Sequence, residues 1–139
     1  MGVWLLTSAL LQLVSSFNLL AMADSTAPKV EIVDATVTAV RVPSQFDEGQ
    51  RAQIVIEGEL PSDCYSVGNI TIRSPQEDLD QGIIQFHVNA VRSIRSNCSA
   101  AKTSFMKVVE LGNLPARTYK ILNYKNLRKM AQLEVTKIQ

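Results

Sequence analysis

The chain has 139 residues, of which 46% are hydrophobic and 6% aromatic, and its formal net charge is only +1. This length corresponds to one domain. One histidine and two cysteines are too few for a zinc or copper centre, which gathers several such ligands in one place, so we expect neither a metal nor another cofactor.

An uncharged, mostly apolar run occupies residues 3–23 and ends in the sequence AMA, a small-x-small site typical of signal peptidase cleavage. A polar, charged stretch begins at Asp24. We therefore predict a helical signal peptide over residues 1–23 and one periplasmic or secreted domain over residues 24–139. The run is also about as long as the roughly 20 residues that cross a membrane, so an uncleaved anchor is the alternative.

An exported domain exposes Cys64 and Cys98 to an oxidising compartment, where an even pair most simply forms one disulfide. Closing a loop of about 35 residues stabilises the fold by roughly 3 to 4 kcal/mol in the chain-entropy model. Two buried free thiols are the alternative. A catalytic cysteine needs a neighbouring histidine or cation to lower its pKa, and the single histidine makes that role a poor fit.

Seven segments have the alternating or β-rich pattern of strands and are separated by polar or turn-forming stretches. In chain order they cover residues 30–42, 51–60, 65–73, 83–91, 104–111, the run that opens at Tyr119, and 130–138. We expect a break or sheet switch at Asp34-Ala35, a bulge at Gly68-Asn69, and an acidic loop over residues 74–82. Residues 123–126 (NYKN) predict a hairpin turn, because asparagine tolerates positive φ.

The apolar positions of these strands define the expected core. They are Ile54, Ile56, Gly58, Leu60, Ile84, Phe86, Val88, Ala90, Phe105, Val108, Val109, Leu111, Tyr119, Ile121, Ala131, Leu133 and Val135.

The stretch LGNLPARTYKILN, residues 111–123, is typical of the corner of a β-sandwich. In a tyrosine corner, a buried Tyr near the start of a strand sends its hydroxyl back to the backbone a few residues upstream. We expect Tyr119 to take this role after the turn at Leu114 and Pro115, with an acceptor carbonyl within residues 113–116. The predicted fold class is all-β, a seven-stranded antiparallel immunoglobulin-like sandwich.

Three features together resemble small immunoglobulin-like domains of bacterial exported proteins. These features are a strand ending in GELPSDC, a second cysteine shortly before an apolar strand, and the corner LGNLPARTYKILN. Arg117 and Tyr124 stand where the family pattern has glycine. The resemblance covers most of residues 24–139 and implies a fold but no chemistry, since the family's motifs are structural.

Charge is distributed unevenly along the chain. Residues 24–91 hold four basic and eleven acidic side chains, whereas residues 92–139 hold ten basic and two acidic ones. Lys120, Lys125, Arg128 and Lys129 are therefore candidates for a face that binds an anionic partner, such as envelope lipid, polysaccharide or an acidic protein. The alternative is that the basic side chains pair with acids of the first half. Aromatic residues do not alternate with them as nucleic-acid platforms require, so we expect no nucleic-acid partner.

Other polar groups favour a surface role. His87 lies on the polar side of its predicted strand, and Glu57 and Glu59 share one outer face, which suits a surface and not a catalytic pocket. The acidic loop lacks the spacing of an EF-hand. Two glycosylation sequons begin at Asn69 and Asn97 and matter only in a eukaryotic secretory pathway; we favour a bacterial origin.

The sequence thus predicts a non-catalytic exported module that binds or stabilises an unknown envelope component through its loops or an open sheet edge. The alternative is a small secreted inhibitor or ligand-binding protein that acts through loops tied by the Cys64–Cys98 disulfide. After signal cleavage, neither would be an integral membrane protein.

Overall fold

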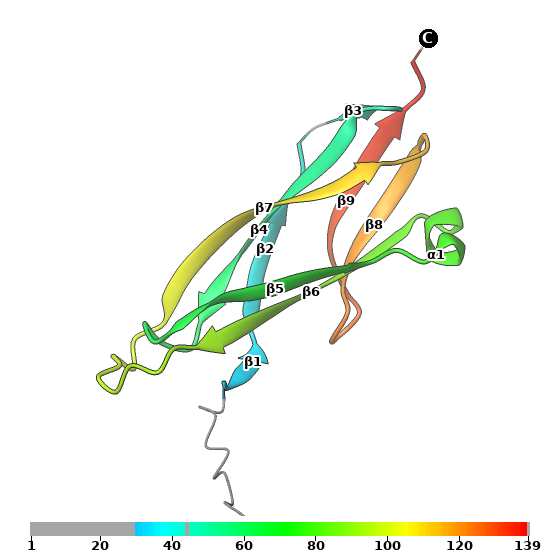
Figure 1. Cartoon of the computed structure of the whole chain (residues 1–139). Helices are drawn as coiled ribbons and strands as arrows, with labels where there is room; N and C mark the ends of the chain where they lie inside the picture. The colour runs from blue at the N-terminus through cyan, green and yellow to red at the C-terminus, as the bar shows by residue number, and fades with distance from the viewer. Residues whose placement is uncertain (1–29, 44, 139) are drawn as a thin grey trace, which may run out of the picture.

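The computed structural model describes residues 30–43 and 45–138, so the predicted signal peptide and the predicted domain start at Asp24 lie outside the described residues. Most of the described chain is β-strand, in two sheets (Figure 1). The strands are β1 (Ile32–Asp34), β2 (Thr36–Arg41), β3 (Phe46–Asp47), β4 (Arg51–Leu60), β5 (Tyr65–Arg73), β6 (Ile83–Arg92), β7 (Thr103–Asn113), β8 (Arg117–Asn123) and β9 (Arg128–Thr136). A short helix, α1 (Gln76–Asp80), forms part of the predicted acidic loop. Within the described ranges, the helices are too short or too polar to cross a membrane.

The larger sheet has the order β1-β6-β8-β9-β3, and β5 also pairs with β6, outside this order. The smaller sheet has the order β2-β4-β7. The prediction of an antiparallel sandwich is wrong for the larger sheet, because β6 pairs with β8 and β3 pairs with β9 in parallel. The chain leaves the larger sheet after β6, passes through β7 in the smaller sheet, and returns as β8 in the direction of β6. Alternation of apolar residues does not encode this choice of direction.

The first predicted strand divides between the two sheets, so that nine strands replace the expected seven in the described chain. β1 pairs with β6 and β2 pairs with β4. Between them, Ala35 is buried, and its amide donates a hydrogen bond to the Val88 carbonyl over 3.0 Å. The predicted sheet switch at Asp34-Ala35 is therefore confirmed. The two-residue strand β3, which pairs with β9, was not predicted and accounts for the second additional strand.

The core lies between the sheets and follows the alternation of β4 and β6. On each of these strands every second residue is buried, as predicted. The fully buried side chains include Ile54, Ile56, Ile84, Phe86, Val88, Tyr119, Ile121 and Leu133. Full burial of each large apolar side chain contributes about 1.5 to 3 kcal/mol, so these two strands form the stable centre of the sandwich.

A glycine on β4 makes room for an aromatic ring on β7. Gly58 is the register partner of Phe105. A Cβ at position 58 would lie 2.6 Å from the Phe105 ring and 2.3 Å from the carbonyl oxygen of Thr36. Glycine is therefore required at this point of the pairing between β2, β4 and β7.

Two irregularities test the turn predictions. The register of β5 against β6 shifts between Val67 and Ile70, which confirms the bulge predicted at Gly68-Asn69. The hairpin between β8 and β9 turns over residues 124–127, and the non-glycine residue with positive φ in the described chain is Leu127, at 53°. The predicted reason for the turn is thus wrong: the Asn123 side chain accepts a hydrogen bond from the Lys125 amide over 3.0 Å instead of taking positive φ.

Candidate functional site

The predicted corner residues Leu114, Pro115 and Tyr119 form a structural unit. Tyr119 is fully buried, and its hydroxyl donates a hydrogen bond to the Pro115 carbonyl over 2.9 Å, within the segment to which the sequence assigns the acceptor. Leu114 is buried beside it in the core. Burial raises the pKa of the Tyr119 hydroxyl. These contacts hold the turn against the start of β8, so Tyr119, Leu114 and Pro115 have a structural role at the corner.

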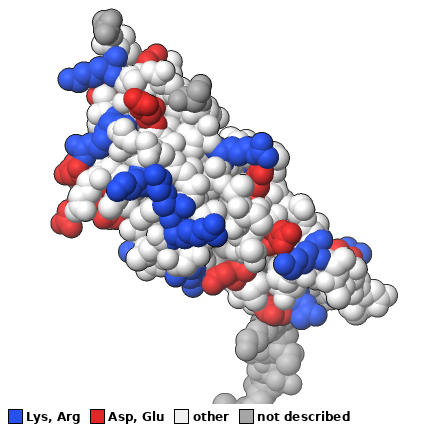
Figure 2. All heavy atoms as spheres, turned by 180° about the vertical axis from the view of Figure 1, so that it is seen from behind, with Lys and Arg blue, Asp and Glu red and all other residues white. Residues whose placement is uncertain are grey.

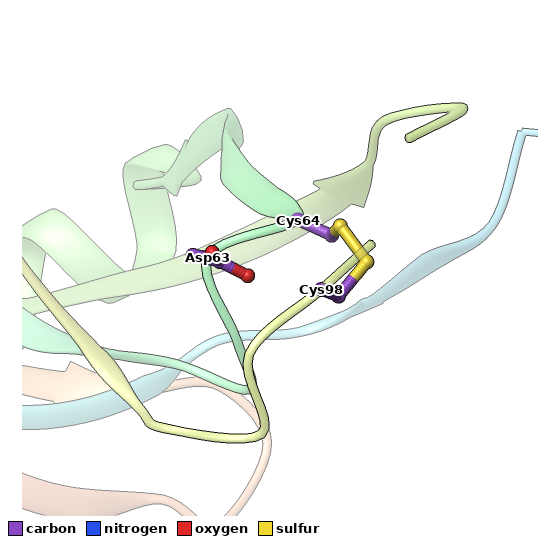
Figure 3. Close-up of side chains that lie close together, drawn as sticks. All are labelled: Asp63, Cys64 and Cys98. Carbon is purple, nitrogen blue, oxygen red and sulfur yellow. A yellow bond between two sulfur atoms is a disulfide. The ribbon is translucent and has the colours of Figure 1, made fainter. Parts of the chain in front are cut away.

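Cys64 and Cys98 form the predicted disulfide, with 5.3 Å between their Cα atoms. Figure 3 shows this bond joining the residue just before β5 to the loop before β7, with Asp63 close by. The Asp63 carboxylate accepts a hydrogen bond from the Ser99 amide over 2.7 Å. Metal-ligating atoms of all three residues lie within 4.8 Å of one another, but sulfurs joined in a disulfide do not supply thiolate ligands. The cluster therefore fixes the loop.

The disulfide ties down the loop of residues 93–102 between β6 and β7, which we call the stapled loop, and this loop carries an exposed apolar side chain. Ile94, in the loop after β6, is 83% exposed. It borders a shallow hollow of about 360 Å³ that also includes Glu31 and Arg92. Arg92 contacts Glu31 over 2.9 Å. This hydrogen bond is the main cause that lowers the pKa of the Glu31 carboxyl, and a hydrogen bond from Tyr65 lowers it further. The loop thus presents one apolar side chain beside an ion pair.

His87 lies on the outer face of the larger sheet, but it is not the solvated side chain that its position suggests. Its side chain is only 18% exposed, and its Nε2 lies 2.7 Å from Asp34 Oδ1. Lys125 reaches the other carboxylate oxygen of Asp34 over 3.3 Å. The hydrogen bond with His87, followed by that with Lys125, lowers the pKa of Asp34. Asp34 therefore ties β1 to β6 and to the turn between β8 and β9.

The predicted anionic-partner face is only partly free for a ligand. Lys125 pairs with Asp34, and the Lys129 ammonium donates to the Gln132 side chain over 3.0 Å. Lys120 is the register partner of Gln132, and Arg128 is exposed where β9 begins. Figure 2 shows Lys and Arg side chains grouped near the middle of one face, with acidic side chains around them.

Ion pairs between the two halves of the chain account for part of the uneven charge. Arg92, Lys102 and Lys125 each pair with an acid of the first half. Some basic side chains are therefore engaged within the fold, as the alternative interpretation of the charge distribution expects.

The outer face of the smaller sheet carries an apolar strip that the sequence pattern does not predict. Met106 and Val108 on β7 are each 64% exposed. Val108 is the register partner of Val55 on β4, which is half-buried. The prediction of Val108 as a core residue is wrong: the inner side of β7 carries Phe105, Lys107 and Val109. We call Val55, Met106 and Val108 the β7 strip.

Charged pairs surround the β7 strip. Glu57 contacts Arg41 over 2.6 Å, and Glu59 contacts Lys102 over 3.0 Å, so the two carboxylates share the outer face as predicted. Arg51 and Glu110 approach to 3.8 Å at the other end. Beside Met106 lies a shallow hollow of about 390 Å³. An apolar centre within a polar rim is the usual composition of a protein–protein contact surface.

A scan against protein-family models, a search of curated proteins and a search of solved structures each return no match to this chain. The fold itself is a small β-sandwich-like domain of two sheets with one disulfide. A disulfide is typical of an oxidising location outside the cytoplasm. What the protein does must therefore be inferred from its exposed side chains.

Proposed function

We propose that this protein is an exported, non-catalytic, immunoglobulin-like binding module whose smaller sheet docks onto a protein of the cell envelope. The observation that carries the proposal is the exposure of Met106 and Val108, each at 64%, on one strand of a sheet whose neighbouring positions hold ion pairs. Exposed apolar side chains that cluster within a charged rim favour a binding surface, because their burial by a partner is favourable.

Three features support the immunoglobulin-like assignment. They are the sheet switch at Ala35, the hydrogen bond from Tyr119 to the Pro115 carbonyl, and the disulfide between Cys64 and Cys98. The apolar run over residues 3–23, which ends in a small-x-small site, supports export to the periplasm or beyond.

The second candidate is a small secreted inhibitor or ligand-binding protein that uses the stapled loop. A specific observation favours it: Ile94 is 83% exposed on a loop that Cys98 ties to Cys64. A loop that a disulfide ties down loses less entropy on binding, so its exposed apolar side chain suits insertion into a partner's cleft.

Site-specific photocrosslinking in the producing cell separates these two functions. A photoreactive amino acid replaces Met106, Ile94 or, as a control on the outer face of the larger sheet, Gln132. We expect one defined crosslinked product from position 106 and none above background from position 132. The product should disappear when Val108→Glu is added, whereas Gln132→Glu should leave it unchanged.

The outcomes of this experiment differ for each function. A product from position 94 but not from position 106 supports the inhibitor function and contradicts docking by the smaller sheet. A product from position 106 that survives Val108→Glu at an unchanged unfolding midpoint also contradicts docking through the β7 strip.

A further inference from the structure

β7 presents a free strand edge next to the β7 strip. In the described chain, β7 pairs with β4 alone, and β5, the nearby edge of the larger sheet, pairs with β6 alone. The two edges come close at one side of the sandwich (Figure 1). β7 is also a long strand, running from Thr103 to Asn113. Its outer edge can therefore form backbone hydrogen bonds with one additional strand.

A lysine occupies an inner-face position of this free edge. Lys107 is the register partner of Ile56, which is fully buried, so both side chains start from the core side of the smaller sheet. Lys107 is nevertheless exposed, because β7 lies at the edge and the long side chain reaches past it to water. Its neighbours on the inner face, Phe105 and Val109, are half-buried. The ion pairs of the described residues do not include Lys107.

An added strand would change the environment of this lysine. The residue placed opposite Lys107 would share the inner face, and its backbone would cover the route by which the ammonium reaches water. Burial of an unpaired charge is costly, whereas a carboxylate in the opposite position would compensate it. Lys107 therefore selects among the strands that can pair with this edge.

We infer that the β7 edge binds an extended segment of a partner protein, which adds as a strand and places an Asp or Glu opposite Lys107. This inference rests on the proposed function and specifies the partner of the same surface. Apolar residues of the partner strand would face Phe105 and Val109 on the inner side and Met106 and Val108 on the outer side. The recognised segment is thus apolar with one central acidic residue.

Through its described β7 and β5 edges, a second copy of the chain would not place a carboxylate opposite Lys107. The inner positions of β7 hold Phe105, Lys107 and Val109, and its acid, Glu110, pairs in register with Gln53 on the outer face. The inner positions of β5, the other nearby edge, hold Val67, Ile70 and Ile72. Pairing of two copies through these edges would bury Lys107 against apolar residues or against another lysine. Inward-pointing charges of this kind prevent edge-to-edge self-association.

Binding of two synthetic peptides that differ in the charge of one residue tests the inference. Two short peptides alternate valine and threonine and differ only in the central inward-facing residue, which is glutamate in one and lysine in the other. We expect the wild-type protein to bind the glutamate peptide about tenfold or more tightly than the lysine peptide, by fluorescence anisotropy. Lys107→Glu should reverse this preference. Lys137→Glu, at an exposed position just after β9 of the larger sheet, is the control and should retain it.

Amide hydrogen exchange shows where the peptide binds, and binding of the glutamate peptide should slow exchange in β7. The inference is overturned if neither peptide binds, if the wild-type protein binds both equally, if β7 exchange is unchanged, or if the protein dimerises through β7. The experiments distinguish failure of strand addition from failure of the proposed function. If the crosslink from position 106 forms and tolerates Lys107→Glu, docking by the smaller sheet stands and recognition of an acidic strand does not.

Discussion

The hydroxyl of Tyr119 donates a hydrogen bond to the backbone carbonyl of Pro115, 2.9 Å away and four residues earlier in the chain. This bond joins a residue at the centre of the core to the turn that leads from the smaller sheet back to the larger one. The turn fixes where β8 enters the larger sheet. There β8 pairs in parallel with β6. The arrangement of the larger sheet therefore depends on this corner.

Removal of the Tyr119 hydroxyl should weaken the fold without changing it. We expect Tyr119→Phe to lower the free energy of unfolding by roughly 1 kcal/mol or somewhat more, because a buried hydrogen bond is lost. Tyr124→Phe is the matched control: the ring of Tyr124 is partly exposed and retains its contact with Arg73, 4.6 Å from the ring centroid. Equal denaturation midpoints for the two variants would contradict a stabilising role for the hydrogen bond from Tyr119 to Pro115.

The disulfide should contribute strongly to stability. Cys64 and Cys98 are 34 positions apart, a separation for which the chain-entropy model gives about 3 to 4 kcal/mol. We expect the double variant Cys64→Ser, Cys98→Ser to lose this amount in denaturant unfolding, and a reductant to bring the wild-type protein to the same midpoint. A reductant that also shifts the double variant would show that the effect does not come from this bond.

Acid should weaken the contact between Asp34, His87 and Lys125. The pKa of Asp34 is lowered in the folded protein, so its stabilisation is complete above the ordinary value of about 3.9 and is lost as the pH falls through the lowered value. Asp34→Asn should be less stable than wild type at pH 7 by no more than about 1 kcal/mol, since the carboxylate is half exposed. This difference should vanish in strong acid.

Thermal unfolding midpoints across this pH range measure that difference. Glu134→Gln, an exposed carboxylate on the same sheet, is the control. A gap between wild type and Asp34→Asn that stays constant from neutral to strongly acidic pH would contradict the assigned role of the Asp34 carboxylate.

Gly58 should not tolerate even a methyl group. In Gly58→Ala the new Cβ would lie 2.3 Å from the Thr36 carbonyl oxygen, a backbone atom, so the strands must shift. We expect a loss of about 1 to 3 kcal/mol in the free energy of unfolding, the usual cost of overpacking, despite the smaller entropy of the unfolded alanine chain. Ser104→Ala, an exposed neighbour on β7, should change stability by less than about 0.5 kcal/mol.

Local patterns in the sequence predicted those parts of the fold that depend on neighbouring residues. Strict alternation identified the buried faces of β4 and β6, and the pair Gly68-Asn69 identified the bulge in β5. The parallel pairing of β6 with β8 was not predictable in this way, because it depends on the route of the chain through the other sheet. The contact between His87 and Asp34 joins residues 53 positions apart and leaves no local pattern.

One residue, Lys107, prevents the sequence pattern from predicting the β7 strip. In the sequence FMKVVEL, which begins at Phe105, a lysine at the inner position interrupts the alternation that would assign Met106 and Val108 to the outside. Consecutive valines then match either face, so the pattern alone predicts Val108 as a core residue. The same lysine that hides the pattern is the residue to which we assign partner selection at the β7 edge.

Amide hydrogen exchange of the full protein, alone and in complex with the partner captured from position 106, tests the central claim of docking through β7 most directly. We predict slower exchange in Thr103–Asn113 on complex formation and unchanged exchange in Arg128–Thr136. Unchanged exchange in Thr103–Asn113, with protection confined to the stapled loop or to the hairpin of β8 and β9, would contradict it.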